Sequence, residues 1–447
     1  MKRRIVRFWL PIWVTPRFLY AFGAVALLWA CSAAIPSFGI VAAVVAGGIV
    51  CATVLDAVGG PRPNLIAVRR QARPHLALRS TAALDYTLEN RSNVEIRAGI
   101  VESPVRTLRF LEDEAVAAAP AGSRVTIARA VLPVARGADA FGALYVWYEN
   151  RYGLLRRRMR VDSTEPFRVY PDLSALARYG HLTARKRTID AGLRKLRARG
   201  AGTEFESVRE WNDGDEFRAI DWNATARRGK VMVSQHEIER SQNVMLLIDC
   251  GRLMTPRVGD RRKLDYAITA ALSLAGVAGS AGDRVGAVAF AGAIVAATAP
   301  RSTRASIARL TELLYDLEPR FEEANYGAAF AYLRRHLRKR SLVVLFTDAV
   351  DPLSQPALMA ELGSLSRRHV LLCAFMSDAA IDAALAVAPV AIDDAYRAAV
   401  ALDLREERRA AAARLTRAGA IVVDVPANEL TVALVDRYLR VKQRGLL

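Results

Sequence analysis

Cysteine and histidine are scarce in this chain of 447 residues, which contains four cysteines and five histidines. Cys31 and Cys51 lie in long apolar stretches, and Cys250 and Cys373 lie in or beside short apolar runs typical of strands. Their spacing matches neither a disulfide framework nor a zinc site, since the cysteines and histidines are scattered along the chain. We therefore assign the four cysteines to packing.

Three motifs that bind nucleotides or present a nucleophile are also missing. The sequence has no G-x-G-x-x-G after the first apolar strand of its C-terminal half, no G-x-x-x-x-G-K-[ST] and no G-x-S-x-G. The first two cradle phosphates, and the third exposes a catalytic serine. We therefore expect neither a dinucleotide nor a nucleoside triphosphate, and the commonest hydrolase chemistry of α/β folds is not indicated.

Acidic residues are outnumbered, because 64 Lys and Arg face 45 Asp and Glu and give a formal charge of +19. Such a chain is attracted to an anionic partner, and the apolar stretches at its start favour a membrane surface over nucleic acid. Between Phe18 and Ile35 no residue is charged, and between Gly39 and Val58 only Asp56 is. Each stretch has about the length that a helix needs to cross a bilayer.

Basic residues flank both outer ends of this apolar pair, whereas the connection between the two stretches is uncharged. The basic residues are Lys2, Arg3, Arg4, Arg7, Arg17, Arg62, Arg69, Arg70 and Arg73. The positive-inside rule then predicts a transmembrane helical hairpin within residues 1–60, with both ends in the cytoplasm. The alternatives are a cleaved signal peptide or a lipoprotein signal ending at Cys31, and the second apolar stretch argues against both.

Within residues 61–170 the hydrophobic pattern has a period of two from about Leu76 to Val169. Leu84, Tyr86 and Leu88 are followed, after Asn90–Asn93, by Val94, Ile96 and Ala98, which predicts a β-hairpin with one buried face. Residues 143–148 and 154–161 predict a second hairpin, and the whole region predicts a small antiparallel β-sandwich. A run of four arginines on the last of these strands favours a solvated edge, with a lipid-facing patch as the alternative: Arg156, Arg157, Arg158 and Arg160.

Residues 171–242 combine a basic connector with an acidic, aromatic segment. The connector, 173–199, predicts a helix that could bind an anionic polymer or form a charge clamp with the carboxylates beyond it. Those carboxylates could also serve in acid–base catalysis, although the sequence does not select a pair: Glu204, Glu206, Glu210, Asp213, Asp215 and Glu216. We favour a structural role, in which Trp211 and Trp222 pack this segment against the next domain.

Three sequence motifs in and just after this segment resemble those of a known family. GTEFESVREW, NDGDEFRAIDWNATAR and HEIERSQNVMLLID follow one another with short spacings. In this order they resemble the membrane-anchored bacterial family of domain of unknown function fifty-eight, which couples such a segment to a von Willebrand factor A-like domain. The resemblance implies the β-sandwich, a place in the bacterial inner (plasma) membrane, and a functional link with MoxR-type AAA+ ATPases in protein assembly or maturation.

Residues 243–447 alternate between apolar runs and helical stretches, which predicts an α/β doubly wound parallel sheet. The predicted strands are 244–248, 285–290, 342–346, 370–375 and 421–425. The predicted helices are 263–281, 303–317, 326–338 and 404–418. Asp249 directly follows the first of these strands, so it should lie at the carboxyl edge of the sheet, where ligands bind.

The resemblance also implies a metal site, since von Willebrand A-like domains can bind a cation through a D-x-S-x-S motif, a threonine and a second aspartate. This chain keeps Asp249 and Asp348, but Gly251, Leu253 and Ala324 replace the two serines and the threonine. Two carboxylates make a poor magnesium site, so we expect no cofactor and at most weak magnesium binding. Arg252 is expected to pair with Asp249 or Asp348 in place of the cation.

We therefore predict a membrane-tethered cytoplasmic adaptor that is not an enzyme. It would present its von Willebrand A-like domain to a protein partner, with a MoxR-type ATPase as the partner that the resemblance implies. Two alternatives stay open. The first is a metal-assisted hydrolase that uses Asp249, Asp348 and the acidic segment, and the second is a binder of anionic polymer through the basic connector.

Overall fold

The computed structural model describes residues 12–149, 152–172, 204–212, 215, 217–237, 241–348, 356–377, 379–386 and 388–446. The chain forms two compact units, Met1–Tyr170 and Pro171–Leu447, which are described separately. The division falls at the end of residues 61–170, the segment with the predicted β-sandwich, which we call the β region. All four cysteines are unpaired, and Cys250 and Cys373 are buried.

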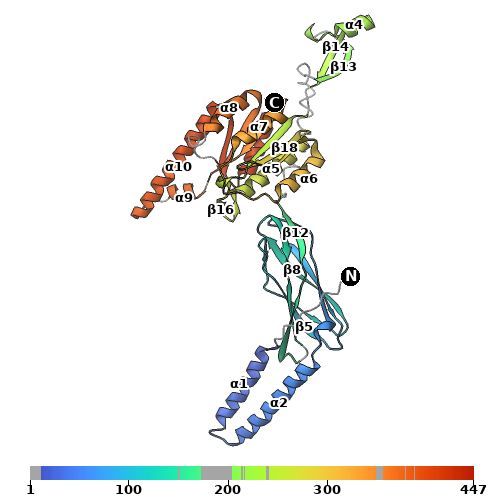
Figure 1. Cartoon of the computed structure of the whole chain (residues 1–447), viewed down its shortest axis with the longest axis vertical. Helices are drawn as coiled ribbons and strands as arrows, with labels where there is room; N and C mark the ends of the chain where they lie inside the picture. The colour runs from blue at the N-terminus through green and yellow to red at the C-terminus, as the bar shows by residue number, and fades with distance from the viewer. Residues whose placement is uncertain are drawn as a thin grey trace. The chain divides into compact units, whose positions relative to one another are not determined.

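Two apolar helices lie side by side at the start of the first unit (Figure 1). They are α1, Pro16–Cys31, and α2, Ser37–Gly59. The first ends four residues earlier than the predicted stretch, and its 16 residues span only about 24 Å at a rise of about 1.5 Å per residue. Within the described part of the chain, α2 is the one helix that is long and apolar enough to cross a membrane.

Strands of three sheets make up the rest of this unit and share one hydrophobic core. The five-stranded sheet contains, in spatial order, β1 (Ile12–Val14), β11 (Leu155–Val161), β10 (Leu144–Glu149), β5 (Ile96–Glu102) and β7 (Ala115–Ala119). The four-stranded sheet contains β2 (Ile66–Gln71), β4 (Ala82–Asn90), β8 (Arg124–Pro133) and β6 (Leu108–Phe110). The three-stranded sheet contains β3 (His75–Ala77), β12 (Glu165–Tyr170) and β9 (Gly137–Phe141), and a short 3-10 helix, Pro63–Leu65, precedes β2.

The predicted hairpin around residues 90–93 is wrong, because its two strands lie in different sheets. β4 pairs with β2 and β8, whereas β5 pairs with β10 and β7. The buried Asn90 holds the crossing, since its side-chain amide donates to the carbonyls of Val94, Ala119 and Pro120 at 2.8, 3.0 and 3.0 Å. The predicted pairing of 143–148 with 154–161 is present as the antiparallel pair β10 and β11.

Among the described residues of the second unit, β13 (Glu204–Glu210) and β14 (Met232–Glu237) form an antiparallel pair. A 3-10 turn, Phe217–Ala219, and α4 (Trp222–Arg228) separate the two strands. Trp222 is 69% exposed, so the prediction that it packs against the next domain is wrong. Trp211 is half-buried and lies 6.3 Å from the ring of Phe217. The basic connector, 173–199, lies outside the described residues.

The α/β part of the second unit contains a six-stranded sheet in the order β19-β18-β15-β20-β21-β22. All neighbours are parallel except β19 with β18. The strands are β15 (Asn243–Asp249), β18 (Arg284–Phe290), β19 (Ile294–Arg301), β20 (Leu342–Phe346), β21 (Val370–Ser377) and β22 (Ile421–Pro426). The sequence predicts five of the six, and β19 is the addition.

Helices cover both faces of this sheet, as a doubly wound fold requires. On one face α5 (Lys263–Ser280), α6 (Thr303–Leu314) and α11 (Leu430–Gln443) pack against Val244, Leu246 and Ile248. On the other face α7 (Tyr326–His336), α8 (Pro356–Arg368) and the end of α10 (Ile392–Arg417) pack against Met245 and Leu247. The remaining elements are a 3-10 turn, Arg252–Met254, the short strands β16 (Arg257–Val258) and β17 (Arg261–Arg262), and α9 (Ala379–Ala386). Successive side chains of β15 point to opposite faces of the sheet, and helices cover both faces. The strand is therefore apolar throughout.

Candidate functional site

The strand order creates a switch point at the carboxyl end of β15. The chain leaves β15 toward β18 on one side and later places β20 on the other side. In open α/β sheets the crevice at such a point is the usual place for a ligand. Asp249 ends β15, and Thr347 and Asp348 follow β20, so the two predicted aspartates meet at this edge.

Asp249 is fully buried, and both of its carboxylate oxygens are already engaged. Oδ1 accepts the backbone N–H of Gly251 at 2.7 Å. Oδ2 accepts the hydroxyls of Thr347 at 2.7 Å and Tyr326 at 3.0 Å. Burial raises the pKa of Asp249, although these donors oppose the shift and the nearby Asp348 adds to it.

Tyr326 reaches the site from the first turn of α7 and is itself buried. Burial, followed by the charge of Asp249, raises the pKa of Tyr326 well above its usual value, so the phenol stays protonated and able to donate. Its oxygen also lies 2.8 Å from the hydroxyl of Thr347. The aspartate is therefore held by a small buried network rather than left open toward solvent.

Asp348 is paired with two cations. Its Oδ2 accepts the ammonium of Lys263, the first residue of α5, and its Oδ1 accepts Nη1 of Arg408 from α10 at 2.9 Å. The side chains of Lys263, Arg408 and Asp348 are only 9%, 11% and 4% exposed. Arg408 also contacts Asp424 of β22 at 2.7 Å, which joins the site to the far strand of the sheet.

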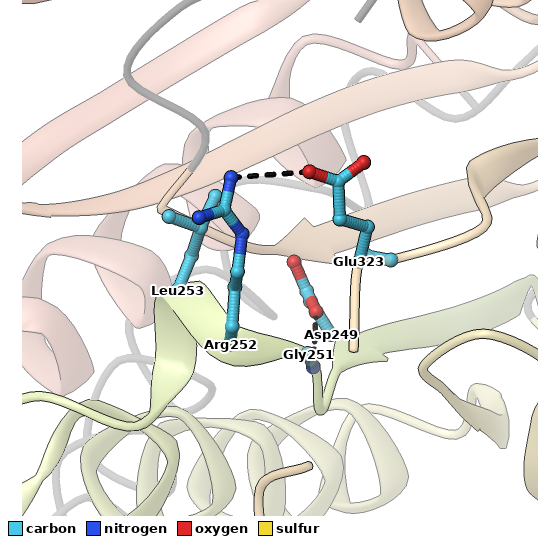
Figure 2. A pocket seen from close by; sticks show the side chains of 6 residues that line it. Asp249, Gly251, Arg252, Leu253 and Glu323 are labelled. Carbon is cyan, nitrogen blue, oxygen red and sulfur yellow. Dashed lines mark hydrogen bonds and ion pairs between the residues drawn. The ribbon is translucent and has the colours of Figure 1, made fainter. Parts of the chain in front are cut away.

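Arg252 does not take the place predicted for it. Instead of Asp249 or Asp348, it pairs with Glu323 at 3.1 Å, and both side chains are largely exposed. Figure 2 shows this ion pair above Asp249, across a hollow lined by these residues and by Gly251, Leu253 and Ala324. The space in the hollow that the centre of a water-sized sphere can occupy is about 10 Å³, which is about the room needed by one water molecule.

These residues do not fit a magnesium site. The oxygens of Asp348 face an ammonium and a guanidinium, and those of Asp249 accept three hydrogen bonds. A Cβ on Gly251 would lie 2.9 Å from the carbonyl oxygen of Glu322, so the serine of an adhesion motif would be crowded there. In the described part of the chain, no group of three or more His, Cys, Asp or Glu side chains is placed to hold a metal ion.

Two carboxylates of the acidic segment have local partners. Asp215 binds Arg209 at 2.6 Å, and Glu210 binds Lys230 at 2.9 Å. The side chains of Glu204 and Glu206, together with Asp213 and Glu216, lie outside the described residues. The charge clamp with the basic connector therefore stays a prediction.

Sequence reasoning missed Lys263, Arg408 and Tyr326. A signal existed for Lys263, because a helix that follows the first strand of a doubly wound sheet begins near the carboxyl edge, and its first residue can point toward the site. Arg408 lies in the charged stretch LREERRAAAAR, whose pattern does not distinguish an arginine that binds the sheet from its exposed neighbours.

Comparison with known proteins places these features in a family context. Residues 207–420 match the family model described as Protein of unknown function DUF58. Uncharacterized protein Rv1480 of Mycobacterium tuberculosis is 24% identical over 269 residues, which cover 56% of this chain and 82% of that protein. Uncharacterized protein YeaD of Bacillus subtilis is 46% identical over 43 residues, covering 10% of this chain and 11% of that protein. Among solved structures, the SpRpn10 VWA domain matches 43% of this chain and 94% of its own, with 11% identity and a TM-score of 0.30.

Proposed function

Residues 207–420 match a family model described only as a protein of unknown function, so we propose a function from the site itself. We propose that the protein is a membrane-tethered adaptor of the bacterial inner membrane. Its von Willebrand A-like domain would present the switch-point edge to a protein partner in the cytoplasm, and a MoxR-type AAA+ ATPase is the proposed partner. We refer to the surface formed by Arg252, Leu253, Glu323 and Ala324 as the switch-point rim.

One observation carries the proposal: Asp348 is neutralised from within the chain by Lys263 and Arg408. A cation-dependent site would need this carboxylate free, whereas an adaptor needs only a stable, well-defined surface. The small volume of the hollow supports the same function, since it offers little room for a substrate. The exposed charges of Arg252 and Glu323 give the switch-point rim a polar pattern that a protein partner could match.

The proposal of a membrane tether is based on the two apolar helices, α1 and α2. Large apolar side chains of α1 and α2 are exposed, among them Leu27 at 68%, Val44 at 71% and Val58 at 80%. Apolar surface of this extent on paired helices is stabilised when lipid covers it. We propose that the pair spans the membrane as a hairpin and that the β region is a cytoplasmic β-sandwich.

A pull-down of the tagged full-length chain from native membranes tests the adaptor function. The wild type should retain an AAA+ ATPase, and the charge reversals Arg252→Glu and Glu323→Arg should weaken its recovery. Arg440→Glu is the matched control, because Arg440 forms a similarly exposed ion pair with Asp436 on α11. Equal recovery with both rim variants and with the control would show that the partner binds elsewhere.

A further inference from the structure

The start of α1 and the end of α2 both form hydrogen bonds with one turn of the β region, residues 153–155. Thr15, which caps α1, is 3% exposed, and its hydroxyl donates to the carbonyl of Gly153 at 2.7 Å. The backbone N–H of Thr15 donates to the carbonyl of Leu154 at 3.0 Å. From the other helix, the carboxylate of Asp56 accepts the N–H groups of Leu154 at 3.0 Å and Leu155 at 2.8 Å.

A cation from the β region closes the end of α2. Arg157 of β11 donates to the carbonyls of Gly60 at 3.2 Å and Pro61 at 3.0 Å, and also to that of Ala57. The last carbonyls of a helix lack partners within the helix and carry partial negative charge, so a guanidinium stabilises them. Tyr148 adds a hydrogen bond from its hydroxyl to Pro61 at 3.0 Å. These bonds fix the β region to the helix ends, in contrast to a flexible linker.

Amphipathic side chains surround this junction. Trp13 and Tyr152 are 51% and 56% exposed, and the guanidinium of Arg158 lies 4.4 Å from the centre of the Trp13 ring. Arg17, in the first turn of α1, is also exposed. No charged residue follows along α1, so the charged and aromatic groups stand where the apolar surface begins. Tryptophan, tyrosine and arginine are enriched at this level of membrane proteins, because their apolar bodies and polar ends suit the interface.

We propose that Trp13, Arg17, Tyr152 and Arg158 form a membrane-docking surface that binds the headgroups of anionic phospholipids. This inference rests on the proposed membrane tether and extends it, since docking fixes the orientation of the β region on the bilayer. The lipid supplies phosphate for the two arginines and an interfacial layer for the two aromatic rings. Neighbouring arginines of β11 thus have different roles. Arg157 binds the end of α2, whereas the side chain of Arg158 is exposed.

The test uses the full chain reconstituted into vesicles of phosphatidylcholine with or without phosphatidylserine. A fluorophore is attached through Tyr152→Cys after the exposed Cys31 and Cys51 have been replaced by serine. A quencher on the lipid headgroup reports proximity. Tyr145→Cys is the matched control, since Tyr145 is 48% exposed on the same pair of strands but lies four residues before the end of β10.

The probe at position 152 should be quenched by headgroup-labelled lipid, and the probe at position 145 should not. In vesicles with phosphatidylserine, Arg17→Gln or Arg158→Gln should weaken docking about fivefold each, which corresponds to ~1 kcal/mol per basic residue near an anionic surface. Equal quenching at positions 145 and 152 in protein that resists alkaline extraction would overturn the docking surface. Release of the wild-type chain by alkaline extraction would instead overturn the tether itself.

Discussion

The pair formed by Lys263 and Asp348 offers the sharpest test of the site. Both side chains are almost fully buried, and Arg408 is a second partner of the same carboxylate. Removing one partner of a buried ion pair costs ~3–5 kcal/mol, mostly because the other charge is left uncompensated. Lys263→Met leaves Asp348 with Arg408, so we expect a loss near the lower value. Asp348→Asn leaves the ammonium of Lys263 without a carboxylate, while Arg408 keeps only Asp424, so we expect a loss near the upper value.

The double variant Lys263→Met/Asp348→Asn should be more stable than the sum of the two single losses predicts, because it removes both charges of the pair and leaves neither one buried alone. For a domain of this size each kcal/mol shifts the thermal midpoint by ~2–4 °C, so Lys263→Met should lower the midpoint by roughly 6–12 °C. Differential scanning fluorimetry of the detergent-solubilised full chain measures the midpoint. Millimolar magnesium should leave the wild-type midpoint unchanged.

Lys230→Met is the matched control for this experiment. It removes an ion pair with Glu210 in which both side chains are more than 60% exposed, and exposed pairs contribute only ~0–1 kcal/mol. If Lys263→Met destabilised the protein no more than Lys230→Met, or if the two losses simply added, the buried pair would not hold the site. A clear rise of the wild-type midpoint with magnesium would revive the metal-dependent hydrolase.

Three further predictions concern other parts of the chain. Trp222→Ala should change stability by less than about 0.5 kcal/mol because Trp222 is exposed, whereas Trp211→Ala should cost ~1 kcal/mol or more through its contact with Phe217; thermal unfolding compares the two, and equal losses would contradict the assignment. Burial raises the pKa of Asp249 in the folded chain above its value in the unfolded chain, which is near 3.8. The contribution of Asp249 to the free energy of unfolding is therefore fully present below pH 3.8 and is lost as the pH rises through the higher pKa of the folded chain. Asp249→Asn should flatten the pH dependence of stability above pH 3.8, and an unchanged profile would refute the shift. A reporter enzyme fused after Leu447 should be active only in the cytoplasm, and activity on the other side of the membrane would reverse the proposed topology.

The sequence was informative where burial alone decides structure. Val244–Ile248 is apolar throughout, which predicts a buried parallel strand and places Asp249 at its carboxyl edge, as observed. Strand pairing was harder to predict in the first unit, because alternation with a period of two shows which face is buried and not which strand lies alongside. For that reason the strands β4 and β5 were predicted correctly while their pairing was not.

The partners of Asp348 were beyond sequence reasoning for a different reason. Lys263 and Arg408 lie 85 and 60 residues away along the chain and reach the same carboxylate only after two helices have packed at the edge of the sheet. Arg252 is close in sequence to Asp249 and so attracted the prediction, but its backbone leads the side chain outward to Glu323. Proximity along the chain is a poor guide where crossover connections bring distant residues together.

The hydrogen bonds between Asp56 and the β10–β11 turn can form only late in the synthesis of the chain. Asp56 and the N–H group of Leu154 that it binds are separated by 98 residues. At roughly 5–20 residues per second, a ribosome takes about 5–20 s to make the intervening chain. During that interval the end of α2 carries a carboxylate without its native donors, and water must hydrate it. In the membrane hairpin that we propose, the helical pair would therefore insert early, and its depth in the bilayer would become fixed only when the β region has been synthesised and has folded.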